Sequence, residues 1–177
     1  MKKIIIIGAG AMGSAFAVPC VDNKNDVTIV GTHLENDLIE KIKSNDQIHP
    51  ALKTKLSSEV KFEKFEKLQN ILDQDLDIIV CGVSSIGIEW FVKQISKKYK
   101  KGIPIILLTK GLSILDNELT TLSDKIRTLL SKDGHSEINI SAIKGPCLAA
   151  GLANKMRTGT IIANQKVKEA QLLKGII

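Results

Sequence analysis

Short apolar runs rich in β-branched residues alternate along the chain with segments of helical period. Continuous apolar runs of this kind are typical of parallel strands that are covered by helices on both faces. They predict strands at residues 3–8, 26–30, 77–83, 103–109, 138–143 and 160–163. Val60 and Phe62 alternate with charged residues, which predicts a further short strand at the edge of the sheet.

The segments between these strands carry the apolar stripe of amphipathic helices. One stripe comprises Ile88, Phe91, Val92, Ile95 and Tyr99, and another comprises Leu115, Leu119, Leu122, Ile126 and Leu129. Leu68, Ile71 and Leu72 predict a shorter helix, and a last helix starts near Lys166. Pro19 lies inside the helix after the first strand, so we expect that helix to kink or end there. The alternation predicts an α/β fold, a Rossmann-type doubly wound and mostly parallel sheet with helices on both faces.

The length of 177 residues predicts a single domain spanning residues 1–177. With 44% hydrophobic and 25% charged residues, the composition excludes disordered and collagen-like classes. The apolar runs are far shorter than the roughly 18 residues of a membrane span, and we expect neither a span nor a targeting segment. Ile176 and Ile177 look exposed and follow the last helix directly, which predicts a domain truncated at its C-terminus.

The cysteines and histidines are scattered. The three cysteines are Cys20, Cys81 and Cys147, and the three histidines are His33, His49 and His135. No C-x-x-C pair or histidine ligand spacing occurs, so we expect no disulfide framework and no metal site. Free thiols of this kind favour the reducing cytoplasm.

The chain carries a formal net charge of +6 and has a pI of about 9.2, which favours an anionic partner. Aromatic residues make up only 3% of the chain, too few for the stacking platforms of single-strand binders. The lysine-rich segment 97–101 lies at a predicted helix C-terminus, where cations complement the helix dipole. We therefore expect a small phosphorylated substrate rather than nucleic acid.

A glycine-rich motif, Gly8-Ala9-Gly10-Ala11-Met12-Gly13, follows the first strand directly and opens a helix. In this setting Gly8 permits a tight turn, Gly10 lets the backbone approach a pyrophosphate, and Gly13 allows close packing of helix and strand. The phosphates would lie at the helix N-terminus, where free N–H groups favour an anion. The motif predicts a dinucleotide-binding domain.

The end of the second strand reads Gly31-Thr32-His33, where such a domain usually carries an acid for the ribose hydroxyl. Glu35 comes slightly late, so we expect neither an acid nor an arginine at that position. Thr32 or His33 could hydrogen-bond the adenosine ribose, although His33 could equally be a solvent-facing loop residue. The choice between NAD and NADP stays open.

Two further segments follow predicted strands and reach the carboxyl edge of the sheet, where ligands of this architecture bind. Lys110 follows the fourth strand, and its ammonium suits a substrate phosphate or carbonyl. Lys144-Gly145-Pro146-Cys147 follows the fifth and could line the same crevice. A solvated strand end and a Gly-Pro turn before a helix are the plainer interpretations of these two segments.

Four motifs, taken in order, carry a resemblance to a known family. They are Ile7-Gly8-Ala9-Gly10-Ala11-Met12-Gly13-Ser14-Ala15, Val83-Ser84-Ser85, Thr109-Lys110-Gly111-Leu112 and Ile143-Lys144-Gly145-Pro146-Cys147-Leu148-Ala149. Over nearly its whole length the chain resembles the N-terminal cofactor domain of NAD(P)-dependent glycerol-3-phosphate dehydrogenase. Ala17-Val18-Pro19 and Ile29-Val30-Gly31-Thr32 are similar to the archaeal branch.

The resemblance implies that Ala11, Met12, Thr32 and Ala149 lie against NAD or NADP and that Lys110 contacts both nicotinamide and substrate. Together with the glycine motif, the candidate cofactor-binding residues are Gly8, Gly10, Ala11, Met12, Gly13, Thr32, His33, Lys110 and Ala149. The candidate substrate-binding residues are Lys110, Gly145 and Cys147, with Lys110 as the catalytic candidate. The chain departs from the family pattern at Lys144, Gly151 and Arg157, where a small hydroxyl residue, a glutamate and a proline are usual.

The resemblance also implies hydride transfer between sn-glycerol 3-phosphate and dihydroxyacetone phosphate, a step of glycerophospholipid metabolism. The family carries a C-terminal helical domain, absent here, that supplies a general-base lysine and most phosphate contacts. We therefore expect this chain to bind cofactor and to need that domain for turnover, and its uncovered apolar surface to favour a homo-oligomer. Two other interpretations stay open: a stand-alone dinucleotide-binding or regulatory module without catalysis, and the cofactor domain of another hydroxy-acid dehydrogenase.

Overall fold

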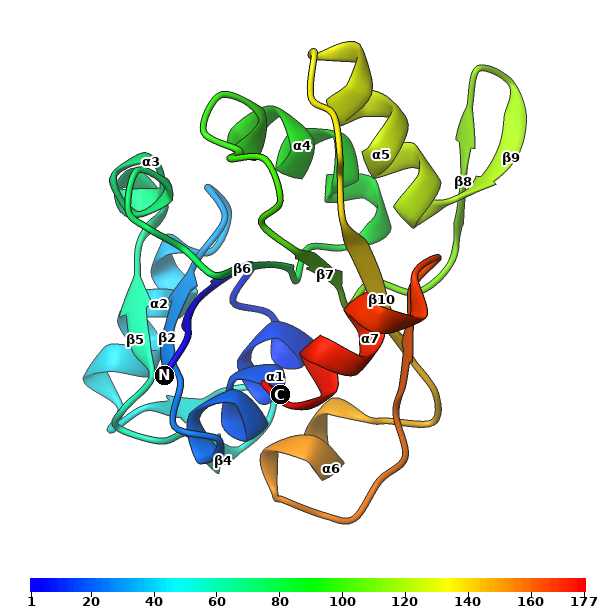
Figure 1. Ribbon diagram of the computed structural model, residues 1–177. Helices are drawn as coiled ribbons and strands as arrows, with labels where there is room; N and C mark the ends of the chain where they lie inside the picture. The colour runs from blue at the N-terminus through cyan, green and yellow to red at the C-terminus, as the bar shows by residue number, and fades with distance from the viewer.

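A seven-stranded sheet runs through the middle of the molecule (Figure 1). The computed structural model describes all residues 1–177. In spatial order the strands are β5 (Lys61–Glu63), β2 (Asp26–Val30), β1 (Lys3–Ile7), β6 (Ile78–Cys81), β7 (Ile105–Leu107), β10 (Ile140–Lys144) and β11 (Ile161–Ala163). All pairs are parallel except β10 with β11. This order, with the crossover between β1 and β6, confirms the doubly wound Rossmann fold.

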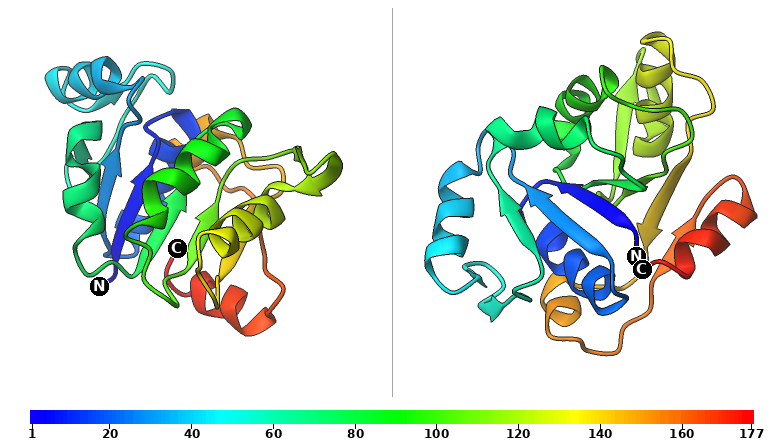
Figure 2. Two further views of the ribbon diagram at one scale, coloured as in Figure 1. Left: turned by 90° about the horizontal axis from the view of Figure 1, so that it is seen from above. Right: turned by 60° about the vertical axis from the view of Figure 1, so that its left-hand side comes forward.

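Helices cover both faces of the sheet, as the two views of Figure 2 also show. One layer contains α1 (Ala11–Asp22), α2 (Asn36–Ser44), α6 (Ala149–Ala153) and α7 (Val167–Lys174). The other contains α3 (Leu68–Leu72), α4 (Ile88–Ser96) and α5 (Leu122–Lys132). Short 3₁₀ turns, η1 (Phe65–Lys67) and η2 (Ser85–Gly87), precede α3 and α4.

The isoleucines of β1 explain why both layers form. Ile4 and Ile6 pack into the α1 layer, whereas Ile5 and Ile7 pack into the α4 layer. All four are buried, because successive side chains of a strand point to opposite faces. A continuous apolar run therefore stabilises the sheet from both sides, as the sequence pattern predicts for a central parallel strand.

Residues 112–121 correct one predicted helix. They form a hairpin of β8 (Leu112–Leu115) and β9 (Glu118–Thr121), which projects from the sheet at the upper right of Figure 1. Asp116 and Asn117 form its turn with φ of +51° and +66°, and both residue types tolerate this left-handed region. Helix α5 starts only at Leu122. The prediction that Leu115 and Leu119 belong to that helix is wrong.

Two smaller expectations are corrected, the first of them in part. Helix α1 continues beyond Pro19 to Asp22, so it does not end at the proline, and a kink there stays a prediction. A proline inside a helix costs about 3 kcal/mol, and the burial of Cys20 and Val21 in the following turn offsets this cost. At the other end of the chain, Ile176 and Ile177 are partly buried against the core instead of exposed.

Two more short strands, β3 (Ile48–His49) and β4 (Thr54–Lys55), pair antiparallel beside α2. None of the helices combines the length and the apolar character that crossing a bilayer requires.

The reactivity of the Cys20 and Cys81 thiols provides a test of the packing of the two helix layers. Burial raises the pKa of each thiol to about 12. We expect iodoacetamide at about pH 8 to leave both unmodified in the folded protein, because the reactive thiolate is scarce and inaccessible. In guanidinium, where the protein is unfolded, both thiols should be labelled. Peptide mass spectrometry measures the extent of labelling at each cysteine. Equal labelling rates in the folded and unfolded states would contradict this packing.

Candidate functional site

The carboxyl ends of the parallel strands lie level with one another. The register pairs Ile7 with both Val30 and Cys81, and Leu107 with both Cys81 and Ala142. The glycine loop, residues 8–13, leads from the end of β1 at this edge into the first turn of α1, at the point where the strand order reverses. In doubly wound sheets this reversal opens the crevice that binds ligands.

Gly8 and Gly13 serve the packing of the fold. Gly8 has a φ of +112°, and its N–H donates to the Val30 carbonyl at 2.9 Å. A Cβ at Gly8 would lie 2.8 Å from the backbone of Gly82, and a Cβ at Gly13 would lie 2.3 Å from the Gly8 oxygen. Strand and helix approach this closely only because both positions lack a side chain.

Gly10 has a different environment. Its φ of −62° suits any residue, and the nearest atom to a Cβ there is Glu35 Oε1 at 3.8 Å. No side chain caps the N-terminus of α1, so no side chain accepts a capping hydrogen bond from its first N–H groups. An uncapped helix start beside an open glycine fits the pyrophosphate of a dinucleotide.

Glu35 lies beside this opening, which corrects the expectation that no acid serves the end of β2. Its Oε2 accepts hydrogen bonds from the N–H groups of Ala9 (3.0 Å) and Thr32 (2.8 Å). Its Oε1 faces Gly10. Glu35 directly precedes α2, and its side chain folds back from the helix start to the end of β2 and to the glycine loop.

The Ala9 carbonyl is also held in place. It accepts hydrogen bonds from Ser14 Oγ and His49 Nε2, each at 3.0 Å. The other ring nitrogen, His49 Nδ1, accepts from the N–H groups of Ala51 and Leu52, so Nε2 carries the proton. The sequence analysis considered His49 only in excluding a metal site, and it missed this contact, which comes from a segment outside the main sheet.

An aromatic cluster of His33, Phe65 and Trp90 lies beyond Glu35 on the β2 side. The His33 ring is 6.0 Å from Phe65 and 5.3 Å from Trp90, and the last two are 5.7 Å apart. His33 itself is exposed, but it packs against these rings and does not project freely into solvent.

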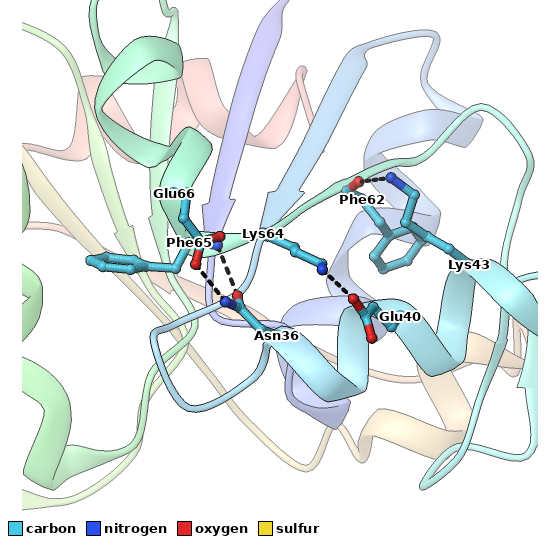
Figure 3. A network of polar contacts seen from close by, with 7 residues as sticks. All are labelled: Asn36, Glu40, Lys43, Phe62, Lys64, Phe65 and Glu66. Atoms are coloured by element: carbon cyan, nitrogen blue, oxygen red, sulfur yellow. Dashed lines mark hydrogen bonds and ion pairs between the residues drawn. The ribbon is translucent and has the colours of Figure 1, made fainter.

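A polar network fixes the position of Phe65 (Figure 3). The Asn36 side chain accepts from the Phe65 N–H at 3.1 Å and donates to Glu66 at 2.7 Å. In the same network Lys64 is paired with Glu40, and this hydrogen bond raises the pKa of Lys64. The cation nearest to the aromatic cluster in this network is therefore already neutralised by a carboxylate.

Lys110 and Lys144 lie on the other side of the glycine loop, at the ends of β7 and β10. Lys110 Nζ donates to the Gly145 carbonyl at 3.1 Å, and Lys144 Nζ donates to the Thr109 carbonyl at 2.9 Å. Each side chain thus crosses to the backbone beside the other. Burial, and then the nearby charge of Lys110, lower the pKa of Lys144.

A cavity of about 560 Å³ lies against these lysines, between α1, β10, β11 and α7. It brings together four of the predicted site residues, namely Met12, Lys110, Gly145 and Cys147. Thr32 and His33 lie on the β2 side of the loop instead, and Ala149 begins α6, partly buried against the α1 layer. The candidate residues outside the glycine loop therefore lie on two sides of it.

The comparisons with known proteins agree with this geometry. Residues 3–170 match the family model described as the N-terminus of NAD-dependent glycerol-3-phosphate dehydrogenase. The chain is 34% identical over 173 residues to the NADP(+)-dependent glycerol-3-phosphate dehydrogenase of Archaeoglobus fulgidus, covering 98% of this chain and 50% of that protein. It is 31% identical over 174 residues to the glycerol-3-phosphate dehydrogenase [NAD(P)+] of Mesoplasma florum, covering 97% and 49%. The chain thus spans about half the length of these curated relatives.

Solved structures share the fold. The glycerol-3-phosphate dehydrogenase of Plasmodium falciparum superposes with a TM-score of 0.81 at 20% identity, over 99% of this chain and 49% of that one. The enzyme of Coxiella burnetii superposes with a TM-score of 0.78 at 18% identity, over 99% and 51%. The family match over nearly the whole chain confirms the resemblance seen in the motifs, including that to an archaeal enzyme. This chain belongs to the family of N-terminal, NAD-binding domains of NAD-dependent glycerol-3-phosphate dehydrogenases.

Proposed function

We propose that residues 1–177 form one dinucleotide-binding domain that supports hydride transfer between sn-glycerol 3-phosphate and dihydroxyacetone phosphate. The observation that carries this proposal is the open space before Gly10, bordered by the uncapped start of α1 and the Glu35 carboxylate. The pyrophosphate of the cofactor belongs at this helix start. Glu35 Oε1 is the acceptor for an adenosine ribose hydroxyl, and the aromatic cluster offers apolar ring surface to the adenine.

The nicotinamide end of the cofactor belongs on the other side of the glycine loop, near Lys110 and Lys144. The bound cofactor supplies a hydride acceptor or donor at C4 of its nicotinamide. Met12 and Ala149 shape the nicotinamide side, and the Lys110 ammonium polarises the substrate oxygen at C2. Gly145 and Cys147 border the same cavity and position the substrate.

The proton of the substrate hydroxyl requires a general base. We assign it to a C-terminal helical domain, as the family resemblance implies. In a direct test, NADH is titrated into the 177-residue chain by calorimetry, and dihydroxyacetone phosphate reduction is then assayed with and without a separately expressed C-terminal half of a relative. Saturable NADH binding with turnover only in the reconstituted sample supports the proposal. Absence of NADH binding in a folded sample overturns it.

We further propose that Glu35 makes this chain prefer NAD over NADP. A 2′-phosphate would face the carboxylate at close range, and Lys64 is already paired with Glu40. We expect NADH to bind at least about tenfold more tightly than NADPH, because one close like-charge contact costs more than about 1.4 kcal/mol. Glu35→Gln keeps an oxygen that can accept from the Ala9 and Thr32 N–H groups, but it removes the negative charge. It should therefore reduce the difference between the NADH and NADPH affinities.

Glu118→Gln is the matched control, because it makes the same charge change on the exposed hairpin strand β9. Its NADH to NADPH affinity ratio should equal that of the unmodified chain. Equal affinities for the two cofactors in the unmodified chain would contradict the role of Glu35.

A further inference from the structure

The crossed lysines at the ends of β7 and β10 each hold one backbone carbonyl. Lys110 reaches Gly145 and Lys144 reaches Thr109, so two ammonium groups are fixed next to one another on neighbouring strands. An ammonium has three N–H donors, and each of these uses one on a carbonyl. The remaining donors are available to a ligand in the adjoining cavity.

This cavity has an unbalanced charge. Its lining includes Lys110, Lys144 and Lys174 and contains no aspartate or glutamate. All ion pairs of the protein are made by other basic side chains. The three lysines of the cavity therefore have no carboxylate partner. Positive charge focused in a concave site attracts an anion.

Lys144 places a partly buried and unpaired positive charge in the cavity. It is only partly exposed and lies close to a second cation, an arrangement that is unfavourable until a negative charge enters. The apolar residues around it, such as Leu108 and Ile143, weaken the screening by water. A ligand with two negative charges would relieve the repulsion between both lysines.

We propose that Lys144, next to the positive charge of Lys110, holds the phosphate of a phosphomonoester in this cavity, so that this half of the enzyme contributes its own phosphate contact. The assignment deepens the proposed function and rests on it for the identity of the ester, glycerol 3-phosphate. A phosphate group could also come from the dinucleotide. The substrate is the favoured source because Gly10 and Glu35, which border the proposed pyrophosphate position, do not line this cavity, although Met12 of the same helix does.

The test is calorimetric titration of the 177-residue chain with glycerol 3-phosphate, inorganic phosphate and glycerol. Four proteins are compared: the unmodified chain, Lys144→Met, Lys144→Arg and Lys101→Met. Lys101→Met is the matched control, because it removes the same charge at an exposed ion pair with Glu137. Circular dichroism checks that all four are folded, and a parallel NADH titration reports on the cofactor site.

We expect the unmodified chain to bind both phosphates and not glycerol, and Lys144→Met to weaken phosphate binding by about tenfold or more. Lys144→Arg should retain most of the affinity, and Lys101→Met should retain all of it. NADH should bind the unmodified chain and Lys144→Met alike and should not displace glycerol 3-phosphate.

The outcomes separate this inference from the proposed function. Phosphate binding that depends on Lys144, in a chain that does not bind NADH, supports the anion site and overturns the dehydrogenase role. No phosphate binding, or equal loss in Lys144→Met and Lys101→Met, overturns the anion site. Competition between NADH and glycerol 3-phosphate assigns the lysines to the dinucleotide and also overturns it.

Discussion

Gly10→Val is expected to weaken NADH binding by at least about a hundredfold while the protein stays folded. The side chain would enter the open space before α1, where a pyrophosphate must approach the backbone within hydrogen-bonding distance. The fold should tolerate it, because the backbone at Gly10 has an ordinary φ of −62° and, apart from its chain neighbours, the nearest protein atom to a Cβ there lies at 3.8 Å. Calorimetry gives the affinity, and thermal unfolding gives the stability.

Gly175→Val is the matched control for this experiment. It makes the same substitution after α7, where φ is −83° and the nearest atom to a Cβ is the Leu172 oxygen at 3.7 Å. NADH affinity should be unchanged in this variant. If Gly10→Val bound NADH as tightly as the control, the pyrophosphate would not lie at this loop.

In contrast to Gly10→Val, Gly13→Ala should destabilise the fold itself. We expect it to lower the free energy of unfolding by about 3 kcal/mol. Its Cβ would lie 2.3 Å from the Gly8 carbonyl oxygen, and both atoms belong to backbone held between β1 and α1. Since neither group can rotate away, the helix must move off the strand. Guanidinium unfolding monitored by circular dichroism measures the loss.

Gly151→Ala provides the contrast, since it also adds a methyl group to a glycine inside a helix. A Cβ there meets only Met156 Cβ at 4.0 Å. We expect this variant to gain about 0.5–1 kcal/mol, because glycine in a helix costs that much relative to alanine. Equal effects of Gly13→Ala and Gly151→Ala would mean that α1 does not pack on β1 as closely as described.

The sheet could be predicted from sequence because its strands are continuous apolar runs with turn residues between them. The β1 run, residues 4–7, has no helical alternative of sufficient length. The hairpin at residues 112–121 was missed because Leu115 and Leu119 continue the spacing of the true helix by coincidence. Asp116-Asn117 was the available turn signal, and the two β-strands around it are only four residues each.

The candidate site was predictable only where the motif itself forms the site. Gly8, Gly10 and Gly13 follow from strand, turn and helix in sequence, since local geometry determines their roles. Glu35 and His49 reach Ala9 from other segments, 26 and 40 positions along the chain. Such contacts depend on how α2 and the β3–β4 segment pack, and no local pattern encodes them. The roles assigned to Lys110, Gly145 and Cys147 stay predictions that the experiments above address.

His49 provides a spectroscopic probe of the glycine loop. Its side chain is 1% exposed and its Nε2 proton is donated to the Ala9 carbonyl, so this proton should exchange slowly with water and give a resolved, far-downfield resonance in proton NMR. A ligand that binds at the loop changes the electronic environment of the Ala9 peptide and should shift that resonance. The chemical shift of this one proton can therefore report ligand binding at the glycine loop in protein that carries neither an isotope label nor a mutation.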